Sequence, residues 1–252
     1  MPATFSYARF APAGNFVDRS QRGIRRIAGR AIKRRNKFMA IVLYDYWRSS
    51  ASYRVRIALA LAGLKYESVQ VNLLEGEHLS AAHRSRNPQG LVPALEIDGA
   101  TLTQSLAIIE YLHETGRGNF LQGSASNRAM TRAVAHAIAM EIHPVCNLTV
   151  ARHAAEASSG AIEFKSWMTT FISKGLSAVE DMLGRFQASA YCCGDEISIA
   201  DICLVPQVYN ARRWGVDISA HKRLLGAVDE AEKLPEVRAA HPDNFKPSGA
   251  EQ

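Results

Sequence analysis

The chain has 252 residues, of which 47% are hydrophobic, a proportion normal for a globular protein and enough for two small domains or one large one. No apolar run approaches the length of a membrane span, so we expect no membrane-embedded part. The four cysteines form no Cys-x-x-Cys pair, which disfavours a structural zinc site and predicts a reduced, cytoplasmic protein; they are Cys146, Cys192, Cys193 and Cys203.

The formal net charge of +6 comes from the first part of the chain. Residues 1–38 contain ten Lys or Arg and one acidic residue, so the rest of the chain contains 20 basic and 23 acidic residues. Such a segment could contact nucleic acid or an acidic surface, and an Arg-rich leader also resembles a transit peptide. Because Met39 begins a tightly patterned segment, we expect 1–38 to be a disordered basic extension and expect no nucleic-acid partner.

From Met39 the chain alternates between strand-like and helix-like patterns. Strands are predicted at 41–46, 66–73, 91–98 and 100–103, and helices at 52–61, weakly at 75–87, and at 105–112. Asp98-Gly99 predicts a hairpin turn, and Ser105 is the expected N-cap of the last helix. Pro93 inside the third strand indicates a cis Val92–Pro93 bond. The order β-α-β-α-β-β-α fits a thioredoxin-like domain over 39–120.

The second half of the chain is predicted to be all-helical. After a linker at 116–126, apolar residues at spacings of three and four predict helices at 128–151, 164–187 and 200–211. Ser198 and Asp201 form a capping-box pattern before the last of these helices. The stretch from His241 is interpreted as a loosely attached tail. The fold class is therefore an α+β N-terminal domain followed by an all-α domain over 127–245.

Two serines, Ser49 and Ser50, lie where the first predicted strand passes into the first predicted helix. Free backbone N–H groups and the positive end of the helix dipole meet at such a point, which favours an anion such as a phosphate, a carboxylate or a thiolate. The alternative is that both serines are only helix N-caps.

Several motifs together resemble the zeta-class glutathione transferases, a family that includes maleylacetoacetate isomerases and maleylpyruvate isomerases. The resemblance covers about 39–245, and one departure is Ala51, because the family has a cysteine after the two serines. The motifs are Tyr46-Trp47-Arg48-Ser49-Ser50, Arg54-Val55-Arg56-Ile57-Ala58-Leu59, Asn87-Pro88, Val92-Pro93, Gln104-Ser105 with the helix after it, and Gly194-Asp195, Ala200-Asp201 and Leu204-Val205-Pro206-Gln207.

The resemblance implies a glutathione site in the first domain. Ser49 is the expected donor to the glutathione thiolate, with Ser50 second. The backbone of Val92, before Pro93, could pair with the peptide as an added strand, and Ser105 could bind the γ-glutamyl carboxylate at a helix start. The remaining expected contacts are Gln104, Asn147 and His78, although His78 is equally well interpreted as a solvated surface histidine.

The resemblance also implies a small dicarboxylic keto acid as the substrate. Carboxylates require cations, preferably Arg, and Arg48 lies beside the thiolate loop. Arg213 matches an arginine of the family, whereas paired arginines at a helix end also compensate the helix dipole. His143 and Asn147 are one helical turn apart and are predicted to share a face, with a core or surface role as the alternative for His143.

The expected activity is a glutathione-dependent cis–trans isomerisation that converts maleylacetoacetate to fumarylacetoacetate, with Ser49, Ser50 and Arg48 as catalytic residues. Alternatives are maleylpyruvate isomerisation, conjugation or dehalogenation of small haloacids, and an inactive scaffold, which Ala51 would favour. No metal constellation is found, because no His-x-x-x-His pattern or carboxylate cluster frames a site. The family also implies a homodimer.

Overall fold

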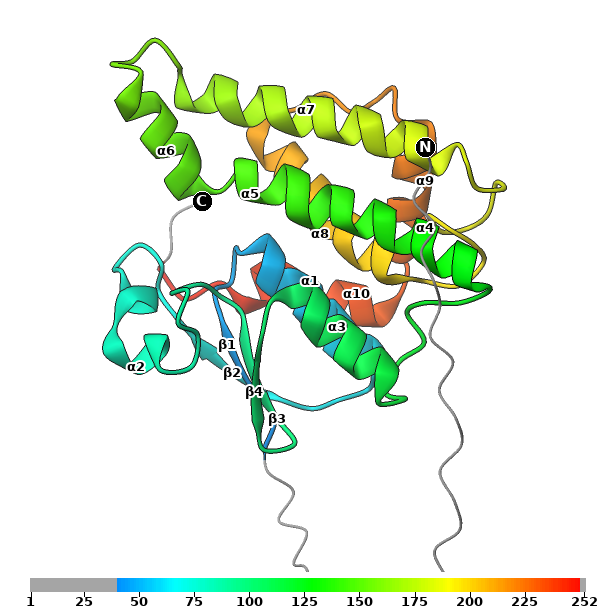
Figure 1. Cartoon of the computed structure of the whole chain (residues 1–252), viewed down its shortest axis with the longest axis horizontal. Helices are drawn as coiled ribbons and strands as arrows, with labels where there is room; N and C mark the ends of the chain where they lie inside the picture. Colours follow the sequence, from blue (N-terminus) through cyan, green and yellow to red (C-terminus); the bar gives the residue numbers. More distant parts are fainter. Residues whose placement is uncertain (1–39, 250–252) are drawn as a thin grey trace, which may run out of the picture. The chain divides into compact units, whose positions relative to one another are not determined.

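The computed structural model describes residues 40–249, so the basic segment 1–38 lies outside the described residues. The first part follows the predicted order of elements (Figure 1). Its elements are β1 (Val42–Asp45), α1 (Ser50–Leu61), β2 (Glu67–Gln70), the 3-10 turn η1 (Glu77–Leu79), α2 (Ala81–Arg84), β3 (Ala94–Ile97), β4 (Ala100–Thr103) and α3 (Ser105–Glu114).

The four strands form one mixed sheet in the order β2-β1-β3-β4. β1 pairs with β2 in parallel, as the helix between them predicts, and β3 is antiparallel to both β1 and β4. In this register Ala94, the first residue of β3, lies opposite both Tyr44 near the end of β1 and Thr103 at the end of β4. The loop after β1, the loop before β3 and the start of α3 therefore meet at one edge of the sheet.

Alternating side chains divide the sheet into two faces. Leu43, Leu95 and Ile97 are buried in a large core that continues through α1 and α3 into the helices of the second half. Tyr44 and Ala94 belong to a smaller apolar cluster on the other face. Because α1 contacts α3, α8 and α10, it lies between the sheet and the helical part (Figure 1).

Local turn chemistry follows the sequence in the β3–β4 hairpin and departs from it at α3. Asp98 and Gly99 both have positive φ, 53° and 82°, as a two-residue hairpin turn requires. The expectation that Ser105 caps α3 is wrong: Gln104, at φ 67°, is the N-cap residue, and Ser105 is the first helical residue. The Ser105 hydroxyl instead accepts a hydrogen bond from another helix, as described below.

The second half is helical and more divided than predicted. Its elements are α4 (Ala125–His136), the π-helical turn η2 (Ala137–Ile142), α5 (His143–Val145), α6 (Leu148–Ala157), α7 (Phe164–Leu183), α8 (Ile199–Trp214), α9 (Lys222–Ala231), α10 (Pro235–Ala239) and the 3-10 turn η3 (Pro242–Phe245). The predicted capping box of α8 is confirmed, with Asp201 accepting from the Ser198 backbone at 2.8 Å.

The prediction of a single helix over 128–151 is wrong, because the chain leaves the helical path at Asn147. Pro144 has no N–H to give to the preceding turn, where the chain widens into π-helical geometry. Asn147 has an extended backbone (ψ 136°), and its side chain caps α6 by accepting from the Thr149 N–H at 2.9 Å. The prediction that His143 and Asn147 share one helix face is therefore wrong.

The stretch from His241 is not a loose tail, which corrects a second expectation. The His241 ring packs edge-on against Tyr53 and Tyr209, with ring centroids 6.1 Å and 5.3 Å away. The Arg56 guanidinium donates to the Ala240 carbonyl at 3.1 Å and lies 4.5 Å from the Phe245 ring centroid. Helix α1 thus holds the last described segment of the chain, through contacts between residues far apart in the sequence.

Arg56 also anchors the end of β1. Its guanidinium donates to both carboxylate oxygens of Asp45, at 2.9 Å and 2.8 Å, and to the Trp47 carbonyl at 2.9 Å. Both side chains of the Arg56–Asp45 pair are fully buried. The pair fixes the loop after β1 because the strand end, the loop carbonyl and α1 share one guanidinium.

We expect Asp45→Asn to destabilise the fold strongly, because it leaves the buried charge of Arg56 without its partner. The free energy of unfolding, measured by urea denaturation, should fall by about 3–5 kcal/mol. Asp98→Asn is the matched control: Asp98 pairs with Arg117 on the surface, and its loss should cost less than about 1 kcal/mol. Equal losses in the two variants would contradict the anchoring role of Arg56.

Candidate active site

The start of α1 offers two backbone donors and one hydroxyl to an anion. Ser49 is the N-cap, and its Oγ accepts from the Ser52 N–H at 3.3 Å. This leaves the Ser49 hydroxyl hydrogen free to be donated elsewhere. Within residues 40–249, the N–H groups of Ser50 and Ala51 have no acceptor. Ser49 is therefore both a helix cap and a potential donor, so the two interpretations of this serine are compatible.

Ala51, where the family has a cysteine, changes a side chain at the start of α1 but leaves the backbone N–H groups there in place. The residue lies in the first turn of α1, where N–H groups lack helical partners whatever the side chain. The dipole of α1 adds to the positive potential at the same point. An ionised sulfur could therefore be held here without a cysteine at position 51.

The loop before β3 presents the backbone of Val92 at the same sheet edge. The Leu91 carbonyl is 2.8 Å from the His83 Nε2 atom and accepts from the Asn87 amide at 2.8 Å, which fixes the loop. The Val92–Pro93 bond is cis, as predicted. Neither the N–H nor the C=O of Val92 is hydrogen-bonded within the described part of the chain, so both are available to an extended peptide.

The start of α3 lies next to this loop. The Gln104 amide donates to the Gln89 side chain at 2.7 Å, which links the N-cap of α3 to the loop before β3. Ser105 is buried, and its Oγ accepts from Arg54 Nη1 at 3.3 Å. The three backbone stretches around Ser49, Val92 and Ser105 are thus brought together by the strand register.

His78 lies in η1, close to Gly90 of the loop before β3. A Cβ added at Gly90, which has φ 63°, would lie 3.2 Å from the His78 carbonyl, so η1 packs closely on this loop. Partial burial, with the charges of His83 and Arg84, lowers the pKa of His78. The Nδ1 atom of His78 is buried without a hydrogen-bond partner among the described residues.

The two predicted substrate arginines lie close enough to influence one another. Partial desolvation, and after it the charge of Arg48, lowers the pKa of Arg213. Arg212 instead pairs with Glu232 at 3.2 Å. Arg48 and Arg213 each lie over a tryptophan ring, with guanidinium-to-centroid distances of 5.0 Å and 5.1 Å. The guanidiniums of Arg48 and Arg213 thus create a site that favours anions, whereas the charge of Arg212 is compensated by Glu232.

His143 is the first residue of α5, and Asn147 is the N-cap residue of α6. Burial, followed by the charge of Arg54, lowers the pKa of His143 to about 3. The imidazole is therefore neutral and cannot serve as a cation for a carboxylate at neutral pH. The Asn147 side-chain oxygen is used to cap α6, which leaves its amide nitrogen for an outside partner.

Two residues of this region were missed by the sequence analysis. Arg54 is 1% exposed and connects α1 to Ser105. Tyr209 lies one turn before Arg213 on α8, with its ring centroid 6.2 Å from that of Tyr53. The spacing of four residues between Ser50 and Arg54, and between Tyr209 and Arg213, places each pair on one helix face and could have indicated both.

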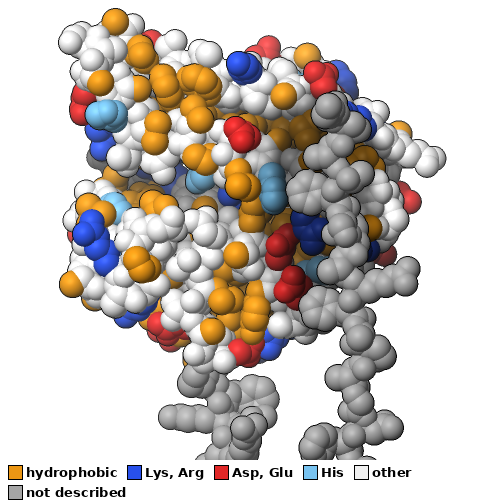
Figure 2. Space-filling view, in the orientation of Figure 1, with side chains coloured by type: hydrophobic (Ala, Val, Ile, Leu, Met, Phe, Trp, Pro, Cys, Tyr) orange, Lys and Arg blue, Asp and Glu red, His pale blue; other side chains and the backbone are white. Residues whose placement is uncertain are grey.

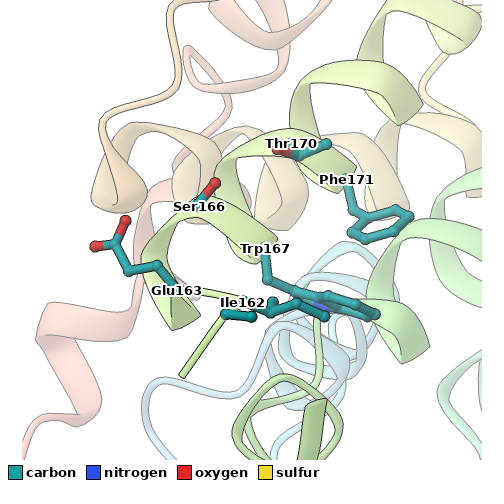
Figure 3. A pocket seen from close by; sticks show the side chains of 7 residues that line it. Ile162, Glu163, Ser166, Trp167, Thr170 and Phe171 are labelled. Atoms are coloured by element: carbon teal, nitrogen blue, oxygen red, sulfur yellow. The ribbon is translucent and has the colours of Figure 1, made fainter. Parts of the chain in front are cut away.

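The surface is hollowed between the sheet-containing part and the helical part, and basic and histidine side chains are visible along the hollow (Figure 2). A separate open pocket of about 230 Å³ lies at the start of α7 (Figure 3). None of the predicted site residues lines this pocket. One lining residue, Trp167, donates its indole N–H to the Val145 carbonyl at 2.9 Å. We therefore place the candidate site at the sheet edge and not in this pocket.

Within residues 40–249, no group of three or more His, Cys, Asp or Glu side chains could hold a metal ion. None of the helices in the same range is both long enough and apolar enough to cross a membrane.

Family models match both halves of the chain. The model described as the glutathione S-transferase N-terminal domain matches residues 39–114, and the glutathione S-transferase C-terminal domain matches residues 172–241. The first match contains Ser49, Val92 and Ser105, and the second contains Arg213.

Curated relatives agree with these matches. A maleylacetoacetate isomerase of Rhizobium meliloti (strain 1021) is 54% identical over 208 residues, which is 82% of this chain and 98% of the relative. The Mus musculus maleylacetoacetate isomerase is 41% identical over 204 residues, covering 80% of this chain and 92% of the relative.

Solved structures of related proteins agree as well. A maleyl pyruvate isomerase, described as a bacterial glutathione-S-transferase in the zeta class, superposes with a TM-score of 0.77 at 36% identity, covering 83% of this chain and all of that one. A maleylacetoacetate isomerase from Anaeromyxobacter dehalogenans 2CP-1, with GSH bound in its active site, gives a TM-score of 0.74 at 39% identity, covering 84% and 98%. The chain belongs to the zeta-class glutathione transferase family, which includes the maleylacetoacetate isomerases.

Proposed function

We propose that the protein is a glutathione-dependent cis–trans isomerase of a maleyl keto acid, converting maleylacetoacetate to fumarylacetoacetate. The observation that carries this proposal is the start of α1, where the Ser49 hydroxyl lies beside the Ser50 and Ala51 N–H groups, which have no acceptor within residues 40–249. The named relatives at 54% and 41% identity support the choice of substrate.

The residues fit glutathione as a tripeptide. An ionised sulfur suits the start of α1, an extended backbone suits the free N–H and C=O of Val92, and a carboxylate suits the start of α3 at Ser105. Gln104, Pro93, His78 and Asn147 are the remaining proposed glutathione residues. The solved relative with bound GSH supports this assignment.

Glutathione, when bound, supplies a thiolate that adds reversibly to the conjugated cis double bond, so that the bond can rotate before the thiolate leaves. The protein's own contribution is to stabilise negative charge. Ser49 donates its hydroxyl and the Ser50 and Ala51 N–H groups face the same anion, which keeps the sulfur ionised at neutral pH. These donors are fixed before the substrate arrives because Arg56 holds the loop that precedes them.

Arg48 and Arg213 are proposed to bind the carboxylates of the substrate. Their mutual repulsion is relieved by an anion, and two guanidiniums match the two carboxylates of the substrate. The same positive charge stabilises the enolate that forms next to the carbonyl during the addition.

A second candidate is maleylpyruvate, because a maleyl pyruvate isomerase shares the fold at a TM-score of 0.77. Both substrates are dicarboxylates with a cis double bond conjugated to a ketone, so the same residues would serve. We also expect a homodimer and a cytoplasmic location, as the family resemblance implies. The exposed Met130 and Met140 side chains on α4 and η2 are available for such a dimer contact.

We expect Ser49→Ala to lower turnover by about 100-fold, the usual loss for one donor to a developing anion. Ser50→Ala should lower it by less than about threefold, since the Ser50 N–H remains. Ser50→Pro removes that N–H at the first helical position, where proline is tolerated, and should approach the Ser49→Ala loss. Turnover is measured by absorbance with maleylacetone, with and without glutathione. Equal, small effects of all three variants would show that the thiolate lies elsewhere.

We expect Arg213→Ala to raise KM for maleylacetoacetate by about tenfold, because a charge-assisted contact to a carboxylate is lost. Arg212→Ala is the matched control and should leave KM unchanged, since Arg212 pairs with Glu232. Maleylacetone, which lacks one carboxylate, should show which end of the substrate Arg213 binds. An unchanged KM in Arg213→Ala would place this residue outside the site.

His143 should stay neutral throughout the working pH range. The folded chain takes up its proton only near pH 3, whereas the unfolded chain takes it up below about pH 6.5. The free energy of unfolding therefore falls as the pH falls through this window, and His143 contributes about 2 kcal/mol of that fall by pH 5. Urea denaturation at pH 7 and pH 5 should show a smaller fall in His143→Gln. Identical falls would mean that folding does not lower the pKa of His143.

A further inference from the structure

Arg54 is a buried arginine whose guanidinium is only partly satisfied. It is 1% exposed and lies on α1, one turn after Ser50. Its Nη1 donates to the Ser105 hydroxyl at 3.3 Å, whereas its Nε and Nη2 atoms are buried without a hydrogen-bond partner in the described part of the chain. Buried polar groups are normally paired, so this guanidinium requires an explanation.

The surroundings of Arg54 are neutral. The groups that influence it are Ser105 on α3, the Cys203 thiol on α8 and His143 on α5. Burial raises the pKa of Cys203 to about 11 and lowers that of His143, so neither group is charged at pH 7. No carboxylate within residues 40–249 forms an ion pair with Arg54.

Arg56, two residues further along the same helix, shows the usual solution. All of its guanidinium nitrogens are paired, with the Asp45 carboxylate, the Trp47 carbonyl and the Ala240 carbonyl. A buried arginine held for packing alone would be expected to have a similar set of partners. The charge of Arg54 is instead left uncompensated beside the proposed glutathione site.

The hydrogen bond from Arg54 sets the direction of the Ser105 hydroxyl. Because Oγ accepts from Nη1, its own hydrogen must point away from the guanidinium. The Ser105 N–H, at the first position of α3, has no acceptor among the described residues. Ser105 therefore presents two donors on its outer side, with a buried positive charge behind them.

We propose that Arg54 is a positioning residue for the γ-glutamyl carboxylate of glutathione, acting through Ser105 and supplying the buried counter-charge. This inference rests on the proposed function. The carboxylate receives the two Ser105 donors and neutralises the charge that the protein alone leaves unpaired. The same helix thus serves both ends of the γ-glutamyl-cysteinyl unit, with N–H groups for the sulfur and Arg54 for the carboxylate.

The test compares two ligands by isothermal titration calorimetry. One is glutathione, and the other is 4-aminobutanoyl-cysteinyl-glycine, which lacks only the γ-glutamyl carboxylate. The full chain should bind glutathione about tenfold to a hundredfold more tightly than this analogue. Arg54→Met should lose most of that preference, because its affinity for glutathione falls while its affinity for the analogue changes by less than about threefold.

Two further variants serve as controls. Val55→Ala removes a neighbouring buried side chain of α1 without changing charge, so the preference should be that of the wild-type protein. Arg54→Lys keeps the positive charge and should restore part of the preference, and it provides a second variant if Arg54→Met does not fold. Without ligand, Arg54→Met should unfold at a temperature no lower than that of Val55→Ala, since it removes an unpaired buried charge.

The outcomes separate two failures. If Arg54→Met and Arg54→Lys weaken both ligands equally, Arg54 only packs α1 and the inference is overturned while the proposed function stands. If the wild-type protein binds glutathione no better than the analogue, the carboxylate is not bound at Ser105 and the inference is also overturned. If the wild-type protein binds neither ligand, the proposed function itself fails and the inference falls with it.

Discussion

The buried ion pair between Arg56 and Asp45 is the interaction on which the arrangement of the site depends. It joins the end of β1, the loop carbonyl of Trp47, helix α1 and the Ala240 carbonyl near the end of the described chain. A hydroxyl and two N–H groups can stabilise an anion only if they are aimed before the anion arrives. The pair provides that fixed geometry, because the segment between Asp45 and Ser50 has few places left to move.

The sheet register supplies the second part of the arrangement. Three stretches that are far apart in the sequence end at one edge because β3 is antiparallel to both of its neighbours. A tripeptide along this edge can meet a helix start at its sulfur, a free strand at its backbone and a second helix start at its carboxylate. None of these contacts would need an unusual residue, so a short sheet with ordinary serines would suffice for them.

Most of the fold could be predicted because its signals are local. The Asp98-Gly99 turn, the cis bond before Pro93 and the Ser198–Asp201 capping box each depend on a few neighbouring residues, and all three expectations are confirmed, although Pro93 lies just before β3 and not inside it. The errors concern competing local signals or distant contacts. Asn147 starts a new helix where periodicity alone continues the old one, and His241 is held by Tyr53 and Tyr209 from distant elements.

The site residues likewise include some that local sequence signals predict and others that depend on the three-dimensional structure. The serines at the helix starts could be predicted from the sequence. The burial of His143 and Arg54 could not, so the neutral state of His143 and the partly unsatisfied guanidinium of Arg54 are visible only in the structure. Neither residue lies in a pattern that distinguishes a buried from a solvated cation.

The absence of a cysteine at position 51 then becomes a question about which groups hold the sulfur ionised. A cysteine side chain would add a weak S–H donor, whereas backbone N–H groups at a helix start are strong donors supported by the dipole. Ala51 keeps its N–H and has good helix propensity, so the strongest of these contributions survives the substitution. An inactive scaffold would have no need of Ser49 together with a Val92 backbone and two arginines, Arg48 and Arg213, that lack hydrogen-bond or carboxylate partners within residues 40–249. Their combined presence favours an enzyme in which the backbone and one hydroxyl carry the stabilisation of the thiolate.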